Sequence, residues 1–146
     1  MKKIMIVDDN YLSAEGIEKN IDWETLNAEI IHVCYNGTSA IEAMKKEPAD
    51  LIISDIEMPD LDGISMSRQA LEINPMVKII LISAYDKFEY ARRALLLGAL
   101  DYIEKPLDYA YLIQKVKNAF ALMEKEQKNL PVSYTHLRAH ETLRHL

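Results

Sequence analysis

The chain has 146 residues, enough for one domain with a hydrophobic core, and its net charge of −6 disfavours direct nucleic-acid binding, which relies on basic patches. The single cysteine, Cys34, excludes an internal disulfide. No apolar run approaches the ~20 residues that span a bilayer, so we expect a cytoplasmic protein that makes no membrane contact.

Short apolar runs alternate with amphipathic ones along the chain. In chain order they predict a strand at 3–7, a helix at 12–21, a strand at 29–35, a helix at 38–47, a strand at 50–54, a helix at 63–73, a strand at 77–82, a helix at 87–97, a strand at 100–103 and a helix at 108–125. The strand runs are apolar throughout, which is typical of a parallel sheet covered on both faces. Five β–α units therefore predict a doubly wound α/β domain.

Single residues refine the predicted helices. Gly98 is expected to end the fourth helix as its C′ residue. Leu12 and Ile17 are expected near one face of the first helix. The inner stripe of the last helix is predicted to comprise Leu112, Val116, Ala119, Phe120 and Met123.

Polar side chains follow four of the predicted strands. They are Asp8 and Asp9 after the first strand, Asp55 after the third, Ser83 after the fourth and Lys105 after the fifth. In a doubly wound sheet, ligands bind beyond the carboxyl ends of the strands. Hard oxygen ligands bind Mg²⁺, a lysine binds a phosphate oxygen, and a carboxylate can act as nucleophile to form an acyl phosphate. The combination predicts a Mg²⁺-assisted phosphoryl-transfer site.

The full pattern resembles the receiver domain of two-component response regulators. It consists of Asp8-Asp9, Asp55 followed by Met58-Pro59 and Asp62-Gly63, then Ser83-Ala84 and Lys105-Pro106. The resemblance covers residues 2–124 and implies a CheY-like, flavodoxin-like fold with a five-stranded parallel sheet of order 2-1-3-4-5 and five helices. We expect the domain to occupy residues 1–126, with residues 127–146 as a tail outside it.

The resemblance also implies the chemistry of the site. Asp55 would accept a phosphoryl group from a sensor histidine kinase, and Ser83 and Lys105 would hold the phosphoryl oxygens. The implied Mg²⁺ ligands are Asp8, Asp9, Asp55 and the backbone carbonyl of Glu57. The domain would assist only its own phosphorylation and dephosphorylation, and would not be an enzyme.

Four further properties are implied by the resemblance. Ser83 and Tyr102 would form a switch, Glu57 and Tyr85 would tune the lifetime of the phosphate, and the Lys105–Pro106 bond would be cis. The output face would combine the fourth helix, fifth strand and fifth helix, and could support a homodimer.

Two segments, Ile21-Asp22-Trp23-Glu24 and residues 83–91, look like receivers attached to AraC-type helix-turn-helix output domains. We therefore expect that this chain is part of a longer transcription regulator. Residues 132–142 resemble a translated sequencing-adapter read-through. A metal site at His136 and His140 is the alternative for the tail, but the spacing differs by one from the zincin His-Glu-x-x-His motif.

Other interpretations remain open. The protein could be a receiver-fold interaction module that never takes phosphate, although the intact residue set argues against this. A haloacid-dehalogenase-type phosphatase needs Asp-x-Asp after its first strand, whereas this chain has Asp8-Asp9-Asn10. Taken singly, Asp8 and Asp9 could cap the next helix, Ser83 could be a turn hydroxyl and Tyr102 a core aromatic residue.

Overall fold

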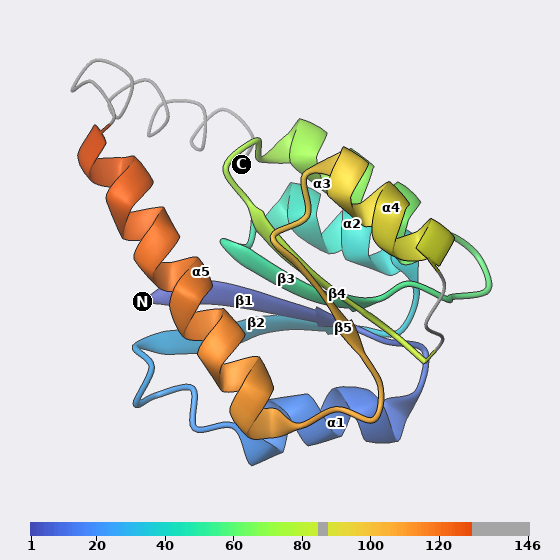
Figure 1. The fold of residues 1–146 in the computed structure, drawn as a ribbon, viewed down its shortest axis with the longest axis horizontal. Helices are drawn as coiled ribbons and strands as arrows, with labels where there is room; N and C mark the ends of the chain where they lie inside the picture. The colour runs from blue at the N-terminus through green and yellow to red at the C-terminus, as the bar shows by residue number, and fades with distance from the viewer. Residues whose placement is uncertain (85–87, 130–146) are drawn as a thin grey trace.

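The computed structural model describes residues 1–84 and 88–129 (Figure 1). The strands are β1 (Lys2–Val7), β2 (Ala28–Cys34), β3 (Leu51–Asp55), β4 (Lys78–Ser83) and β5 (Asp101–Glu104). The helices are α1 (Tyr11–Asn20), α2 (Gly37–Lys46), α3 (Gly63–Ile73), α4 (Phe88–Leu97) and α5 (Tyr109–Asn129). All ten predicted elements are present in the predicted order.

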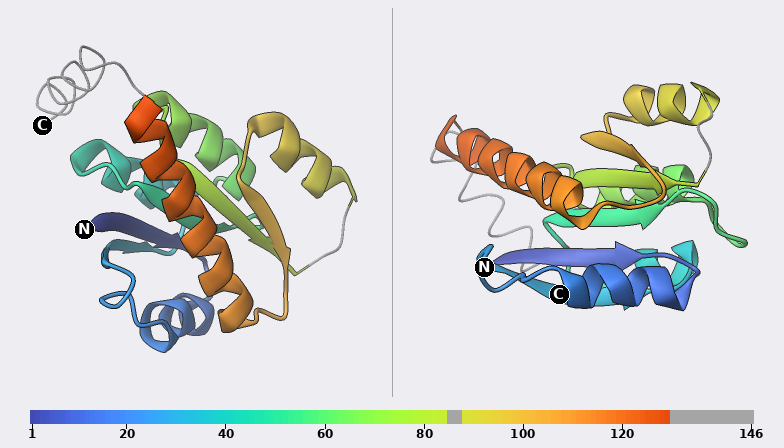
Figure 2. Two further views of the ribbon diagram at one scale, coloured as in Figure 1. Left: turned by 60° about the vertical axis from the view of Figure 1, so that its left-hand side comes forward. Right: turned by 60° about the horizontal axis from the view of Figure 1, so that its bottom comes forward.

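The strands form one parallel sheet in the order β2-β1-β3-β4-β5, which confirms the predicted fold. Helices α1 and α5 cover one face, and α2, α3 and α4 cover the other (Figures 1 and 2). Each strand runs from one edge of this layer to the same opposite edge, so all five carboxyl ends lie together. That arrangement brings the residues after the strands to one rim.

Side chains of the central strands alternate between two apolar clusters. Met5 and Ile52 point toward the cluster under α2, α3 and α4, whereas Ile4 and Leu51 point toward the cluster under α1 and α5. All four are fully buried, and burial of each such side chain contributes roughly 1.5–3 kcal/mol. A one-residue slip of a strand would turn each of its side chains from one apolar cluster toward the other. Because both faces are buried, the register of the strands at the rim is strongly specified.

Four of the described helices begin with a side-chain cap, including α5, where Asp108 accepts from the Ala110 N–H at 2.9 Å. Asn10, Asn36 and Asp62 cap α1, α2 and α3, and Asn10 accepts from the backbone N–H groups of Leu12 and Ser13. The cap of α1 is thus Asn10, so the interpretation that Asp8 and Asp9 cap this helix is wrong. Their carboxylates need another explanation.

The helix ends agree with the prediction at α4 and differ at α5. Gly98 has a φ of 91° and donates to the Leu95 carbonyl, and Ala99 donates to the Ala94 carbonyl, which together form a Schellman motif. Helix α5 continues to Asn129 and so crosses the predicted boundary at residue 126. An ion pair of 2.7 Å between Lys78 and Glu126 holds its last turns against the sheet.

One core prediction was wrong. Leu12 is 80% exposed, because the face of α1 that meets the sheet carries Ala14 and Ile17. The predicted inner stripe of α5 is confirmed, with Leu112 and Val116 fully buried. The tail residues His136 and His140 lie outside the described residues. Among the described helices, none combines the length and apolar character that crossing a membrane requires.

Candidate functional site

Four predicted site residues meet at the carboxyl-terminal rim of the sheet. Asp8, Asp9 and Asp55 each contribute a carboxylate oxygen, and these oxygens lie within 4.8 Å of one another. The Lys105 Nζ lies 3.5 Å from an oxygen of Asp8 and 3.5 Å from an oxygen of Asp55. The chain therefore brings together the acidic and basic residues that the sequence predicted to be neighbours.

Backbone hydrogen bonds hold these residues in place. The Asn10 N–H donates to the Asp8 carboxylate at 2.9 Å, which fixes this side chain at the end of β1. The Lys105 N–H donates to the Ser83 carbonyl at 2.8 Å, which joins the ends of β4 and β5. The Lys105–Pro106 peptide bond is cis, as the sequence resemblance implied.

Burial dominates the electrostatics of the site. Asp8 and Asp55 are 3% and 8% exposed. Burial and the neighbouring Asp8 charge raise the pKa of Asp55 to about 6, against the opposing effect of Lys105. Burial likewise raises the pKa of Asp8. The pair is costly to keep ionised, so a bound cation would stabilise it.

The negative charges of Asp8 and Asp55 act on the neighbouring Lys105 ammonium. Burial alone would lower the pKa of this ammonium, but the Asp55 and Asp8 carboxylates outweigh burial and raise it. Lys105 therefore stays charged at neutral pH. A charged lysine beside two buried carboxylates can bind an anionic oxygen that arrives there.

The two predicted switch residues lie on adjacent strands. Ser83 is fully buried at the end of β4, opposite Glu104 in the parallel register. Tyr102 is half-buried on β5 and packs against the cluster under α2, α3 and α4. Its packing agrees with the core interpretation, which is compatible with a switch role. Tyr85 lies outside the described residues.

Tyr90 joins the site although the sequence singled it out only as part of a resemblance. Its hydroxyl donates to the Glu57 carboxylate at 3.1 Å, and this bond raises the pKa of Tyr90. Both residues line a groove of about 480 Å³ together with Asp9 and Arg93. Since Glu57 and Tyr90 are 33 residues apart, no local sequence pattern could have indicated the contact.

Gly63 fixes the loop that follows the third strand. Its N–H donates to the Ile56 carbonyl at 2.7 Å, and a Cβ built on it would overlap the Asp55 carbonyl oxygen. Gly63→Ala is therefore expected to lower the free energy of unfolding by about 1–3 kcal/mol, measured by urea denaturation. Gly98→Ala serves as control, because it adds backbone strain but no contact within 4 Å. A Gly63→Ala protein with an unchanged free energy of unfolding would contradict the predicted clash.

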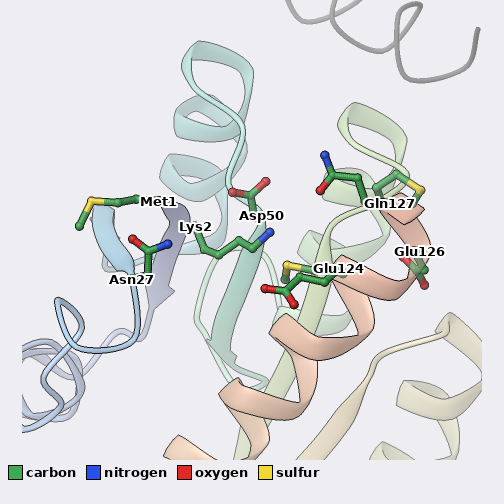
Figure 3. A pocket seen from close by; sticks show the side chains of 9 residues that line it. Met1, Lys2, Asn27, Asp50, Glu124, Glu126 and Gln127 are labelled. Carbon is green, nitrogen blue, oxygen red and sulfur yellow. The ribbon is translucent and has the colours of Figure 1, made fainter. Parts of the chain in front are cut away.

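A second hollow, of about 440 Å³, lies at the opposite edge of the sheet (Figure 3). Its walls come from the start of β1, the residues before β2 and β3, and the last turns of α5. Asp50 there accepts from the Lys3 N–H, and Glu126 pairs with Lys78. These contacts join the starts of the strands to each other and to the end of α5, and none of the residues that the sequence predicted for the site lines this hollow.

The family model of the response regulator receiver domain matches residues 4–117. The chain belongs to this family. The receiver is 29% identical over 126 residues to the uncharacterized transcriptional regulatory protein YesN of Bacillus subtilis, an alignment that covers 86% of this chain and 34% of YesN. The chain thus spans about a third of the length of that relative.

Solved structures agree with the assignment. The receiver domain of AraT, a response regulator of Geobacillus stearothermophilus, has a TM-score of 0.81 and 34% identity, covering 86% of this chain and 98% of that one. A two-component AraC transcriptional regulator of Clostridium phytofermentans has a TM-score of 0.77 and 30% identity, covering 89% and 100%. The likeness to AraC-type regulators expected from the sequence is thereby confirmed. A CheX–CheY–BeF3–Mg complex of Borrelia burgdorferi has a TM-score of 0.72 and 29% identity, covering 82% and 89%.

Proposed function

We propose that this receiver accepts a phosphoryl group on Asp55 from a phosphohistidine of a sensor histidine kinase, with the help of Mg²⁺. The observation that carries the proposal is the cluster of three carboxylates within 4.8 Å, with the Lys105 ammonium 3.5 Å from two of them. The donors are all oxygens, which suits Mg²⁺. Asp8, Asp9, Asp55 and the Glu57 carbonyl would hold the ion, and its charge would offset that of the phosphoryl group.

Residues of this chain would carry out the phosphoryl transfer. A carboxylate oxygen of Asp55 attacks phosphorus, the nitrogen–phosphorus bond of the phosphohistidine breaks, and the imidazole nitrogen takes up a proton. Lys105 exchanges its contact with the carboxylates for one with a phosphoryl oxygen. Ser83 would donate to another oxygen. The receiver promotes only its own modification, as expected for a non-enzyme signalling domain.

The output would follow from the charge added at the rim. A phosphoryl group adds roughly −1.5 to −2 charges, and Ser83 and Tyr102 would respond as one switch beneath α4. The face formed by α4, β5 and α5 would then change its affinity for a partner or a second copy. In a longer transcription regulator with an AraC-type output domain, that change would control DNA binding by the output domain.

The test is incubation with acetyl phosphate and Mg²⁺, read by intact mass. We expect one phosphoryl adduct that requires Mg²⁺ and is lost in Asp55→Asn, because the amide is not a nucleophile for this reaction. Asp50→Asn, at the opposite edge of the sheet, is the matched control and should retain the adduct. An adduct that persists in Asp55→Asn would move the acceptor elsewhere.

A folded protein that never forms the adduct would favour the interaction module. Steady release of phosphate from many phosphoesters would favour the phosphatase instead. Neither alternative has an observation in its support comparable to the carboxylate–lysine cluster.

A further inference from the structure

The phenol of Tyr90 is anchored at both ends. Its ring is half-buried and packs against the apolar cluster under α2, α3 and α4. Its hydroxyl donates to a carboxylate oxygen of Glu57 at 3.1 Å. The first turns of α4 thus hold a side chain that belongs to the loop after β3.

The held carboxylate lies beside the acidic site. Glu57 follows the acceptor by two residues, and it lines the same groove as Asp9. Asp9 in turn belongs to the cluster whose oxygens lie within 4.8 Å of one another. The groove therefore brings Tyr90 and Glu57 to Asp9, one of the three carboxylates of the proposed phosphorylation site.

Tyr90 orients the carboxylate without neutralising it. Arg93, one turn further along α4, lines the same groove. No ion pair joins it to Glu57 in the part of the chain that the structure describes. A hydroxyl donor brings no positive charge to the carboxylate, so the position of Glu57 decides whether it can act on a nearby proton.

We propose that Tyr90 is a positioning residue that holds the Glu57 carboxylate against α4 and thereby lengthens the lifetime of phosphorylated Asp55. The inference rests on the proposed phosphorylation. In hydrolysis, water oxygen bonds to phosphorus, the bond between phosphorus and the Asp55 oxygen breaks, and a released Glu57 takes the proton from the water. The products are the Asp55 carboxylate and inorganic phosphate. While its carboxylate is hydrogen-bonded to Tyr90, Glu57 accepts the proton of the attacking water less often.

The test is a double-mutant cycle on phosphate half-life. The protein is loaded with acetyl phosphate and Mg²⁺, the donor is removed by desalting, and loss of the phosphoryl mass is followed over time. Tyr90→Phe keeps the ring and is expected to shorten the half-life about threefold to tenfold, a range that loss of one hydrogen bond to a carboxylate supports. In a Glu57→Ala background the same change should have no effect.

Two controls separate this role from a structural one. Tyr111→Phe, which removes an exposed phenol on α5, should leave the half-life unchanged. Thermal unfolding of Tyr90→Phe should match that of the unmodified protein within a few degrees. Equal half-lives with and without the Tyr90 hydroxyl, or an effect that persists without Glu57, would overturn the inference while leaving the proposed function intact. If acetyl phosphate and Mg²⁺ do not phosphorylate the unmodified protein, both this inference and the proposed function are overturned.

Discussion

Asp55→Asn is expected to stabilise the metal-free domain at pH 8 by about 1–3 kcal/mol. The folded chain holds Asp55 at 8% exposure beside Asp8, and burial raises its pKa from 3.8 to about 6. A difference of about two pKa units corresponds to about 3 kcal/mol when both states are fully ionised. The asparagine side chain has nearly the same shape and carries no charge, so it avoids this cost.

The stabilisation expected from Asp55→Asn depends on pH. Because the pKa of Asp55 is higher in the folded state, the folded chain binds more protons between about pH 4 and pH 6. The stabilisation that protonated Asp55 gives to the folded chain is fully present below about pH 4 and is lost as the pH rises through about 6. The advantage of Asp55→Asn should therefore shrink by about 1 kcal/mol between pH 8 and pH 5.

Urea denaturation in EDTA at both pH values measures this difference. Asp22→Asn, at an exposed position on the surface, is the matched control and should show no comparable pH-dependent gain. Added Mg²⁺ at pH 8 should narrow the difference in stability, because an ion bound at the proposed site would favour the folded form of the unmodified protein. An Asp55→Asn variant that is less stable than the unmodified protein at pH 8 would refute the unfavourable burial of this charge.

Much of the fold and part of the site were predictable because they depend on local patterns. The buried strands are continuous apolar runs, and the polar residues that interrupt them, such as Asp8 and Asp55, mark the carboxyl edge of the sheet. Parallel pairing then brings these residues together without any further information. The order of the same residues also carried the family resemblance.

What the sequence did not reveal depends on single long-range contacts. The last turns of α5 are held by Glu126 pairing with Lys78, 48 residues away. The bond between Tyr90 and Glu57 spans 33 residues. At Leu12, the spacing fitted an inner face, but the packing of Ala14 and Ile17 against the sheet set the rotation of the helix. Contacts of this kind appear only once the elements are packed.

Lys105→Met is expected to slow phosphorylation of Asp55 by acetyl phosphate about 100-fold at saturating Mg²⁺. The Lys105 Nζ lies 3.5 Å from both buried carboxylates, and within residues 1–84 and 88–129 they have no other ion-pair partner. A positioned donor to a developing negative charge is worth about 100- to 1,000-fold when it is removed. Methionine keeps the apolar stem and deletes the ammonium.

The matched control is Lys78→Met, which breaks the 2.7 Å pair with Glu126 at the opposite edge of the sheet. That variant should lose stability but should load phosphate at nearly the normal rate. Lys105→Arg should recover only part of the rate, since a planar guanidinium replaces a compact charge. A Lys105→Met protein that is folded by circular dichroism and loads within twofold of the unmodified rate would show that the metal alone offsets the phosphoryl charge. In that case Lys105 would serve only to limit the repulsion between Asp8 and Asp55 before phosphate arrives.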